Sequence, residues 1–131
     1  MSDAVPVLVR GKKVAEGKTK QIWEIEGRPN EVEVYSKDDI TGGDGKRHDV
    51  VPGKGAVSNS TTCNVFELLK GADVSVAYKR KLSESSFLAS RADQLPLEIV
   101  IRRRAVGSII ERHPYLQKLH IFVVNMLDII L

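Results

Sequence analysis

A chain of 131 residues with 42% hydrophobic and 28% charged residues has the size and composition of one small folded domain, which excludes a disordered or low-complexity protein. The net charge of +3 suits a protein that binds anionic metabolites and is too small to indicate a nucleic-acid-binding protein. The single cysteine, Cys63, cannot form an internal disulfide, so the composition favours the cytoplasm.

The two ends of the chain give no sign of membrane targeting. The first residues lack the charged leader and apolar core of a signal peptide. The most apolar stretch, residues 119–131, contains ten apolar residues among thirteen. A spanning helix needs roughly 20 such residues, so we expect no membrane partner.

The first patterned segment, residues 16–20, combines one glycine with two lysines in Glu-Gly-Lys-Thr-Lys. It imitates the end of a Walker A loop, but five residues separate Gly11 from Gly17 where four are required. We interpret the segment as a tight turn between two strands, with Lys18 and Lys20 on one face. Gly17 would let the backbone approach phosphates closely, and the lysines would neutralise them. A plain basic hairpin is the alternative.

Alternating and apolar segments predict an antiparallel sheet. The first two segments flank a Gly-Arg-Pro-Asn turn, which predicts a hairpin. The predicted strands cover residues 21–26, 31–36, 74–78 and 98–101.

One helix is expected beside these strands. Apolar residues at helical spacing predict it over residues 57–70, with Gly71 as its stop and Cys63 as a small buried residue. A polar, glycine-rich loop is expected over residues 37–55. Strands with a helix on one face make an α+β domain.

Aspartate and glycine dominate residues 37–46. Their spacing is not that of an EF-hand, because no glutamate lies at the closing position. Asp-Gly and Gly-Gly pairs favour turns, so an ordinary surface turn is one interpretation. The three histidines, His48, His113 and His120, lack metal-ligand spacing, and no zinc site is expected.

Three arginines follow the apolar strand in residues 95–108. Strand alternation predicts Arg102 and Arg104 on one face and Arg103 on the other. At most two of the three could therefore serve one ligand. A solvated face or a nonspecific nucleic-acid patch is the alternative interpretation.

The arginines are followed by a Gly-Ser pair that can open a helix. Ser108 is predicted to be the N-cap of a short helix over residues 109–113, which Pro114 ends. The cations and the helix start together favour a site for an anion such as phosphate.

Three of these segments resemble the motifs of one enzyme family. Residues 95–108, Leu-Pro-Leu-Glu-x-Val-x-Arg-x-x-Ala-x-Gly-Ser, closely resemble a signature of SAICAR synthetase, the phosphoribosylaminoimidazole-succinocarboxamide synthase. Residues 37–46 resemble the substrate loop of that family, and residues 16–20 resemble its nucleotide loop. The three motifs are collinear from about residue 14 to residue 118.

The resemblance implies a fold and a domain organisation. The fold is α+β, an antiparallel sheet with a packed helix, resembling the N-terminal lobe of the SAICAR synthetase fold with the second lobe missing. The implied division is an N-terminal extension over residues 1–13, a family region over residues 14–118 and a divergent apolar tail over residues 119–131.

The resemblance also implies an ATP-dependent ligase of purine biosynthesis. Family members join L-aspartate to the carboxylate of an aminoimidazole ribonucleotide, CAIR, and give SAICAR, ADP and phosphate. ATP and Mg²⁺ are the implied cofactors. Phosphoryl transfer asks the protein mainly for positioning and charge neutralisation, so no catalytic triad is required.

The family's site residues are carried over through the matching motifs. The implied catalytic residues are Lys18, Asp44 and Arg102. The implied ATP-binding residues are Gly17, Lys18 and Lys20, and residues 87–94 correspond to the adenine-side linker between lobes. The implied substrate-binding residues are Thr41, Gly43, Asp44, Lys54, Arg102 and Ser108, with the last two on the 5′-phosphate.

The chain departs from the family pattern at its C-terminal end. A second signature, Asp-x-Lys-x-Glu-Phe-Gly, and the acidic Mg²⁺ ligands belong to the missing part, so no metal ligand is expected here. We expect a truncated form with little or no ligase activity. The alternative is a non-catalytic nucleotide-binding fragment that modulates the full-length enzyme.

The expected partners follow from this interpretation. They are the small molecules CAIR and L-aspartate, and either further copies of the chain in a homo-oligomer or the full-length enzyme. Nucleic acid is not expected among them.

Overall fold

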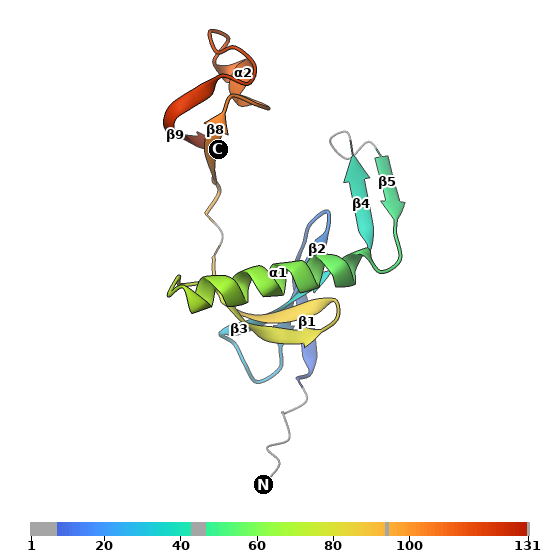
Figure 1. The fold of residues 1–131 in the computed structure, drawn as a ribbon. Helices are drawn as coiled ribbons and strands as arrows, with labels where there is room; N and C mark the ends of the chain where they lie inside the picture. Colours follow the sequence, from blue (N-terminus) through green and yellow to red (C-terminus); the bar gives the residue numbers. More distant parts are fainter. Residues whose placement is uncertain (1–7, 43–46, 94, 131) are drawn as a thin grey trace. The chain divides into compact units, whose positions relative to one another are not determined.

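The computed structural model describes residues 8–42, 47–93 and 95–130 (Figure 1). The chain divides into two compact units, Met1–Ala92 and Asp93–Leu131. Each unit has its own strands and helix.

A five-stranded antiparallel sheet forms the first unit, in the order β1-β2-β3-β7-β6. The predicted hairpin of the second and third strands is confirmed, with Ile22 opposite Val34. Val34 in turn lies opposite Phe87 on β7. The strands are β1 (Arg10–Glu16), β2 (Lys20–Ile25), β3 (Glu31–Ser36), β6 (Tyr78–Ser83) and β7 (Ser86–Ser90).

The helix α1 (Lys54–Gly71) lies across one face of this sheet (Figure 1). Strand alternation on β3 turns Val32 and Val34 towards the helix side, where both are buried. Cys63 is 4% exposed, which confirms the predicted burial. The core of the unit consists of Val32, Val34, Cys63, Tyr78, Phe87 and Ala89, with Ile22, Phe66 and Val76 at its margin.

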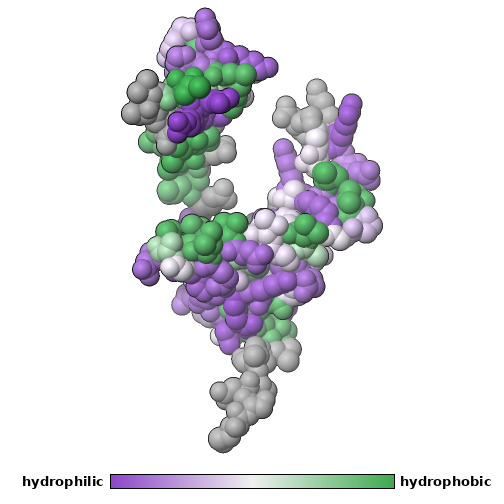
Figure 2. Space-filling view, in the orientation of Figure 1, coloured by the Kyte–Doolittle hydropathy of each residue, from purple (hydrophilic) through white to green (hydrophobic). Residues whose placement is uncertain are grey.

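The helix begins three residues earlier than the sequence predicted, at Lys54 rather than at residue 57. The spacing of apolar residues indicates only the part of a helix that packs against the core, so it does not reveal a first turn without such residues. The outward surface of α1 carries apolar side chains (Figure 2), among them the exposed Val57, Val65 and Leu68.

The prediction of a loop over residues 37–55 is wrong for residues 39–42 and 47–50, which form strands. A two-stranded hairpin of β4 (Asp39–Gly42) and β5 (Arg47–Val50) occupies it, with Thr41 opposite His48. The β-branched residues Ile40 and Val50 favour extended backbone, and the glycines between the strands hid this signal.

The strand predicted over residues 74–78 is also misplaced. Only Tyr78 belongs to β6, which continues to Ser83 through charged residues. Charged side chains are common on an edge strand, and β6 is one, so apolar alternation does not reveal it.

The segment over residues 87–94, expected to link two lobes, begins inside the sheet. β7 lies between β3 and β6, and Phe87, Leu88 and Ala89 are buried there. Residues 91–93 follow the strand, and residue 94 is outside the described part of the chain.

The second unit is an antiparallel hairpin of β8 (Glu98–Arg104) and β9 (Ile121–Ile130), with the short helix α2 (Ile109–Arg112) between them. β8 extends three residues beyond the predicted end at Ile101. The pairing register is irregular between Arg102 and Arg104, which interrupts the alternation from which a shared face was predicted.

The fully buried apolar residues among those described in this unit lie, in sequence order, between its two strands. Ala105 and Ile109 are both 0% exposed. Ala105 also exchanges backbone hydrogen bonds with the segment before β9: its N–H donates to the His120 carbonyl and its carbonyl accepts from the Leu119 N–H. Among the helices described in either unit, none has the length and apolar character needed to cross a membrane.

Candidate functional site

The turn between β1 and β2 contains the predicted nucleotide loop. The Gly17 N–H donates to the Lys20 carbonyl at 2.9 Å, which closes the turn and confirms the strand–turn–strand arrangement. Lys18 lies within the turn and is exposed, whereas Lys20 starts β2 and is half-buried. The shared face of the two lysines stays a prediction, because strand alternation does not continue through a turn.

Lys20 points towards the helix-covered side of the sheet. Its Nζ donates to Ser36 Oγ at 3.2 Å and lies 6.0 Å from the centre of the Phe87 ring. Burial lowers the pKa of Lys20, and the positive charge of Lys54 lowers it further.

The beginning of α1 is held against the end of β3 by Asp38. Its carboxylate accepts from the Gly55 N–H at 2.7 Å and from the Gly53 N–H at 3.1 Å. These are N–H groups that the first turn of a helix leaves without a helical partner. Lys54, the first residue of α1, donates from Nζ to the Asp39 carbonyl at 3.0 Å.

A chain of charged side chains connects the β1–β2 turn to the base of the β4–β5 hairpin. Glu16 accepts from Lys13, from Gln21 at 3.0 Å and from Lys37 at 3.0 Å. These hydrogen bonds lower the pKa of Glu16 to about 2, and the bond from Lys13 has the largest effect.

Asp39 is the member of this row of charged side chains that lies on the β4–β5 hairpin. Lys37 Nζ lies 3.8 Å from Asp39 Oδ1, which contacts His48 Nε2 at 2.6 Å. The hydrogen bond with His48 lowers the pKa of Asp39. Sequence reasoning missed the partnership of Glu16, Lys37, Asp39 and His48, because charges this far apart in sequence give no local signal.

The predicted substrate loop is only partly described. Thr41 is half-buried on β4, and Gly43 and Asp44 lie outside the described residues. A hollow of about 360 Å³ lies on the hairpin, lined by Ile40, Thr41, Gly42, Arg47, His48 and Asp49.

In the second unit, Arg102 holds the loop that follows β8. Its Nη1 donates to the Val106 carbonyl at 2.8 Å, and Gly107 adopts a φ of +69° beside it. A side chain in that left-handed conformation would be strained. Arg102 thus shapes the loop that leads to Ser108.

Ser108 occupies the predicted N-cap position of α2 but makes no capping hydrogen bond with its side chain. The reason is that its backbone is already helical, with φ −58° and ψ −17°. Its Oγ instead accepts from Arg112 Nη1 at 3.1 Å. Arg112 is a neighbour that the sequence analysis did not single out, although it lies one helical turn further on.

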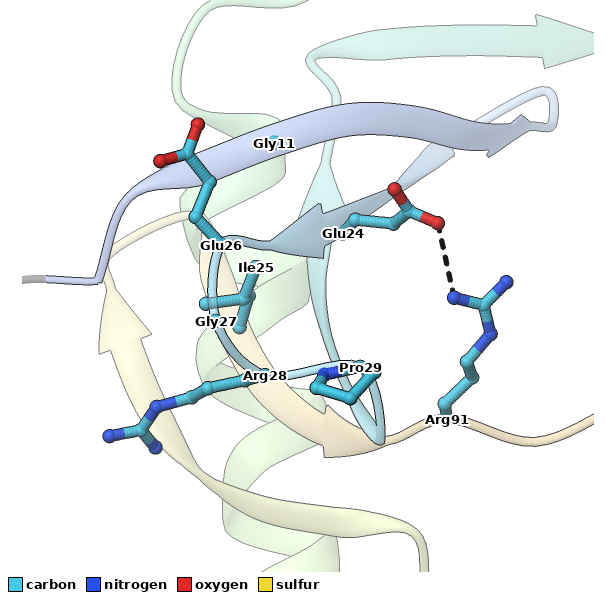
Figure 3. Close-up of a pocket in the computed structure, with 8 residues that line it drawn as sticks. All are labelled: Gly11, Glu24, Ile25, Glu26, Gly27, Arg28, Pro29 and Arg91. Atoms are coloured by element: carbon cyan, nitrogen blue, oxygen red, sulfur yellow. Dashed lines mark hydrogen bonds and ion pairs between the residues drawn. The ribbon is translucent and has the colours of Figure 1, made fainter.

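A second hollow, of about 290 Å³, lies between β1 and the β2–β3 turn (Figure 3). Glu24 and Arg91 form an ion pair there, with Oε1 and Nη1 3.1 Å apart. Of the predicted site, only the linker over residues 87–94 reaches this hollow, through Arg91. Its lining residues are Gly11, Glu24, Ile25, Glu26, Gly27, Arg28, Pro29 and Arg91.

Across the described residues of both units, no three side chains of His, Cys, Asp or Glu lie close enough together to hold a metal ion. The acidic residues around Lys20 and Lys54 are hydrogen-bonded to backbone or to cations instead.

The protein-family model described as SAICAR synthetase matches residues 13–129. Among curated proteins, "Multifunctional protein ADE2" of Gallus gallus is 45% identical over 114 residues, which are 87% of this chain and 27% of that protein. Phosphoribosylaminoimidazole-succinocarboxamide synthase of Roseiflexus castenholzii is 41% identical over 104 residues, 79% of this chain and 42% of that protein. The chain therefore spans about a quarter to two fifths of the length of these relatives.

Solved structures agree with the fold. "SAICAR synthetase (Type-2) in complex with ADP" superposes with a TM-score of 0.76 at 24% identity, over 88% of this chain and 48% of that chain. The antiparallel sheet with a packed helix is thus the fold of about half of a SAICAR synthetase chain, as the sequence predicted.

Proposed function

Because the chain belongs to the SAICAR synthetase family, we propose that it supplies the nucleotide- and ribonucleotide-binding part of an ATP-dependent ligase. The reaction is the joining of L-aspartate to the carboxylate of CAIR, a step of purine biosynthesis. The match of the family model over residues 13–129 carries this proposal. The ADP complex of the solved relative supports the nucleotide as a ligand.

The proposed chemistry explains why cations matter more here than nucleophiles. The terminal phosphoryl group of ATP moves to a carboxylate oxygen of CAIR and leaves ADP. The aspartate amine then attacks the carbonyl carbon of the acyl phosphate, loses a proton and releases phosphate as the amide forms. Both steps need charge neutralisation and positioning.

In the first unit we assign the ATP phosphates to Gly17, Lys18 and Lys20. The tight turn at Gly17 and the fixed ammonium of Lys20 support this assignment. We assign the imidazole substrate and the incoming aspartate to Thr41, Gly43 and Asp44, with Asp44 among the catalytic residues. Lys54 is assigned to the substrate or its phosphate.

In the second unit we assign the 5′-phosphate of CAIR to Arg102 and Ser108. The Ser108 Oγ accepts from Arg112, which leaves its own O–H available to donate to a phosphate oxygen. Arg102 is proposed to act through charge and by holding the loop after β8.

Among the described residues, no three His, Cys, Asp or Glu side chains are grouped in a way that could hold Mg²⁺, so we assign no Mg²⁺ ligand to them. We place the reaction in the cytoplasm, in keeping with a single buried cysteine.

The second candidate function is a non-catalytic fragment that binds nucleotide and modulates the full-length enzyme. The chain spans 27% and 42% of the lengths of the two relatives described above. In this case the chain binds ligands or associates with longer copies and turns nothing over.

Calorimetric titration of the chain with ATP and with CAIR, beside an ATP-dependent assay for the succinocarboxamide product, tests both candidates. We expect ligand binding with little or no turnover, measured against a full-length relative. Turnover comparable to that relative would contradict the non-catalytic candidate. If the chain bound neither ATP nor CAIR, the proposed function would be overturned. Mixing the chain with the full-length relative tests whether the two associate.

A further inference from the structure

Lys37 lies between the two loops to which different ligands are assigned. Its backbone N–H donates to the Thr19 carbonyl at 2.8 Å, which fastens it to the β1–β2 turn. Two residues later Asp39 begins β4, the first strand of the β4–β5 hairpin. Lys37 is therefore the junction between the turn assigned to ATP and the hairpin assigned to the imidazole substrate.

The side chain of Lys37 also reaches both loops. Its Nζ lies 3.0 Å from Glu16 Oε1, at the end of β1 where the turn begins, and 3.8 Å from Asp39 Oδ1 on the hairpin. The Lys37 side chain is 15% exposed, so water screens these contacts only in part. One ammonium group thus joins a carboxylate of each loop.

Each of these carboxylates is also held within its own loop. Glu16 is bound by Lys13 on β1, and Asp39 Oδ1 lies 2.6 Å from His48 Nε2 on the opposite strand of the hairpin. A displacement of either loop therefore moves a carboxylate relative to the Lys37 ammonium group, which costs electrostatic energy.

An ammonium group that lies between two carboxylates is already neutralised, so we do not assign a ligand phosphate to Lys37. Lys20 differs, because its Nζ donates to the neutral Ser36 hydroxyl. We infer that Lys37 is a positioning residue that ties the nucleotide turn to the substrate hairpin, so that the binding of ATP and the binding of CAIR favour one another. This inference rests on the proposed function, from which it takes the ligands of the two loops.

Mutual strengthening of the two ligands follows from the two contacts of Lys37. A ligand that fixes one loop fixes the carboxylate of that loop against Lys37 and reduces the cost of ordering the other loop. Partly exposed ion pairs contribute modestly to stability, so the expected effect is about threefold in a dissociation constant. Linkage requires the same factor for both ligands.

Calorimetric titrations of Lys37→Met test this mutual effect. The non-hydrolysable analogue adenylyl imidodiphosphate replaces ATP and is titrated with and without saturating CAIR, and CAIR is titrated with and without the analogue. In the wild type each ligand is expected to tighten the other about threefold. In Lys37→Met the factor is expected to fall below about 1.5, with the fold checked by circular dichroism, whereas Lys37→Arg keeps the charge and is expected to retain it.

Lys13→Met is the matched control. Lys13 binds the same Glu16 carboxylate, but this ion pair stays within β1. The mutual effect is therefore expected to remain about threefold in this variant. An equal loss in Lys13→Met and Lys37→Met would show that neutralising Glu16 matters and joining the loops does not, and it would overturn the inference. A wild-type chain that binds both ligands independently would overturn it too.

A titration without ligand separates this inference from the proposed function. Lys13 lowers the pKa of Glu16 most and His48 lowers that of Asp39 most, and Lys37 contributes to lowering both. NMR titration of the ¹³C-labelled carboxyl groups is therefore expected to show that Lys37→Met raises the pKa of both groups and that Lys13→Met raises that of Glu16 alone.

The two results of this titration have different consequences. An unchanged pKa of Asp39 in Lys37→Met would overturn the tie between the loops, whatever the ligands do. If both pKa values rose as expected but the wild-type chain bound neither the ATP analogue nor CAIR, the proposed function would fail and the tie between turn and hairpin would stand.

Discussion

Gly55 shows how a single missing side chain positions a candidate site. The first turn of α1 approaches the end of β3 so closely that a Cβ there would lie 2.4 Å from the Ser36 carbonyl and 2.9 Å from Asp38 Oδ1. The backbone oxygen cannot move without disturbing the sheet. Only glycine therefore lets Asp38 reach the helix N–H groups and lets Lys54 reach its partner.

We expect Gly55→Ala to lower the free energy of unfolding by about 2 to 3 kcal/mol, as overpacking does at a tight contact. Urea denaturation measures this change. Gly71→Ala is the control, because nothing lies within 4 Å of a Cβ at the other end of the same helix. The control is expected to be neutral or to stabilise by up to about 1 kcal/mol. Equal effects of the two substitutions would contradict the close-contact explanation.

At the scale of elements, α1 is fastened to the sheet by Asn59. This side chain is 0% exposed, and its Nδ2 lies 3.0 to 3.3 Å from the carbonyls of Ser83, Glu84 and Ser86. The bonds attach the helix to the turn between β6 and β7. The position of α1 on the sheet thus depends on a polar contact as well as on the apolar core.

Asn59→Asp is expected to lower the free energy of unfolding by about 3 kcal/mol or more at pH 7, because it removes the donor and places a carboxylate against carbonyl oxygens. The difference from the wild type is expected to narrow at pH 4, where the new carboxyl takes up a proton more readily in the folded chain. Asn64→Asp, an exposed position on the same helix, is the control and is expected to change stability by less than about 0.5 kcal/mol. A similar loss in both variants would rule out the role of Asn59.

At the scale of the whole molecule, the two units differ in how much they bury. The first has a core shared by five strands and a helix, including three stacked or tilted aromatic rings. The second is a two-stranded hairpin whose described, fully buried apolar residues are Ala105 and Ile109. An isolated hairpin of this kind is only marginally stable in water.

Hydrogen exchange is therefore expected to distinguish the units. Amides of β3 and β7 should be protected at least about 100-fold more than amides of β8 and β9, since opening of the smaller unit does not require opening of the larger core. Mass spectrometry of peptides from each strand measures this ratio. Uniform protection across all four strands would contradict it and would indicate one cooperative unit.

The predicted strands and helix are confirmed where one buried face gives the sequence a regular spacing of apolar residues. The hairpin of β2 and β3 alternates cleanly, and the middle of α1 carries the apolar spacing of its buried face. The β4–β5 hairpin and β6 were missed because exposed and edge strands carry charged residues and glycines in place of alternation. The boundaries predicted at residues 13 and 118 stay predictions, and β9 begins three residues after the second of them.

The residues of the candidate site likewise fall into those that the sequence motifs selected and those that only the structure revealed. Motif resemblance selected Gly17, Lys20, Lys54, Arg102 and Ser108 without any knowledge of their contacts. It could not select Arg112 or His48, because each acts through a partner that the fold brings near. Nor could it show that Lys20 lies on the helix-covered side of the sheet, where its Nζ donates to Ser36.

The order of residues alone determined the family, the strand-and-helix character and the cationic side chains available for phosphates, because motifs and periodicities are local properties of a chain. Only the tertiary structure decided which of those cations stand together. Lys20 and Lys54 are hydrogen-bonded to Ser36 and Asp39, and how closely α1 can approach the end of β3 is set by packing between segments far apart in sequence.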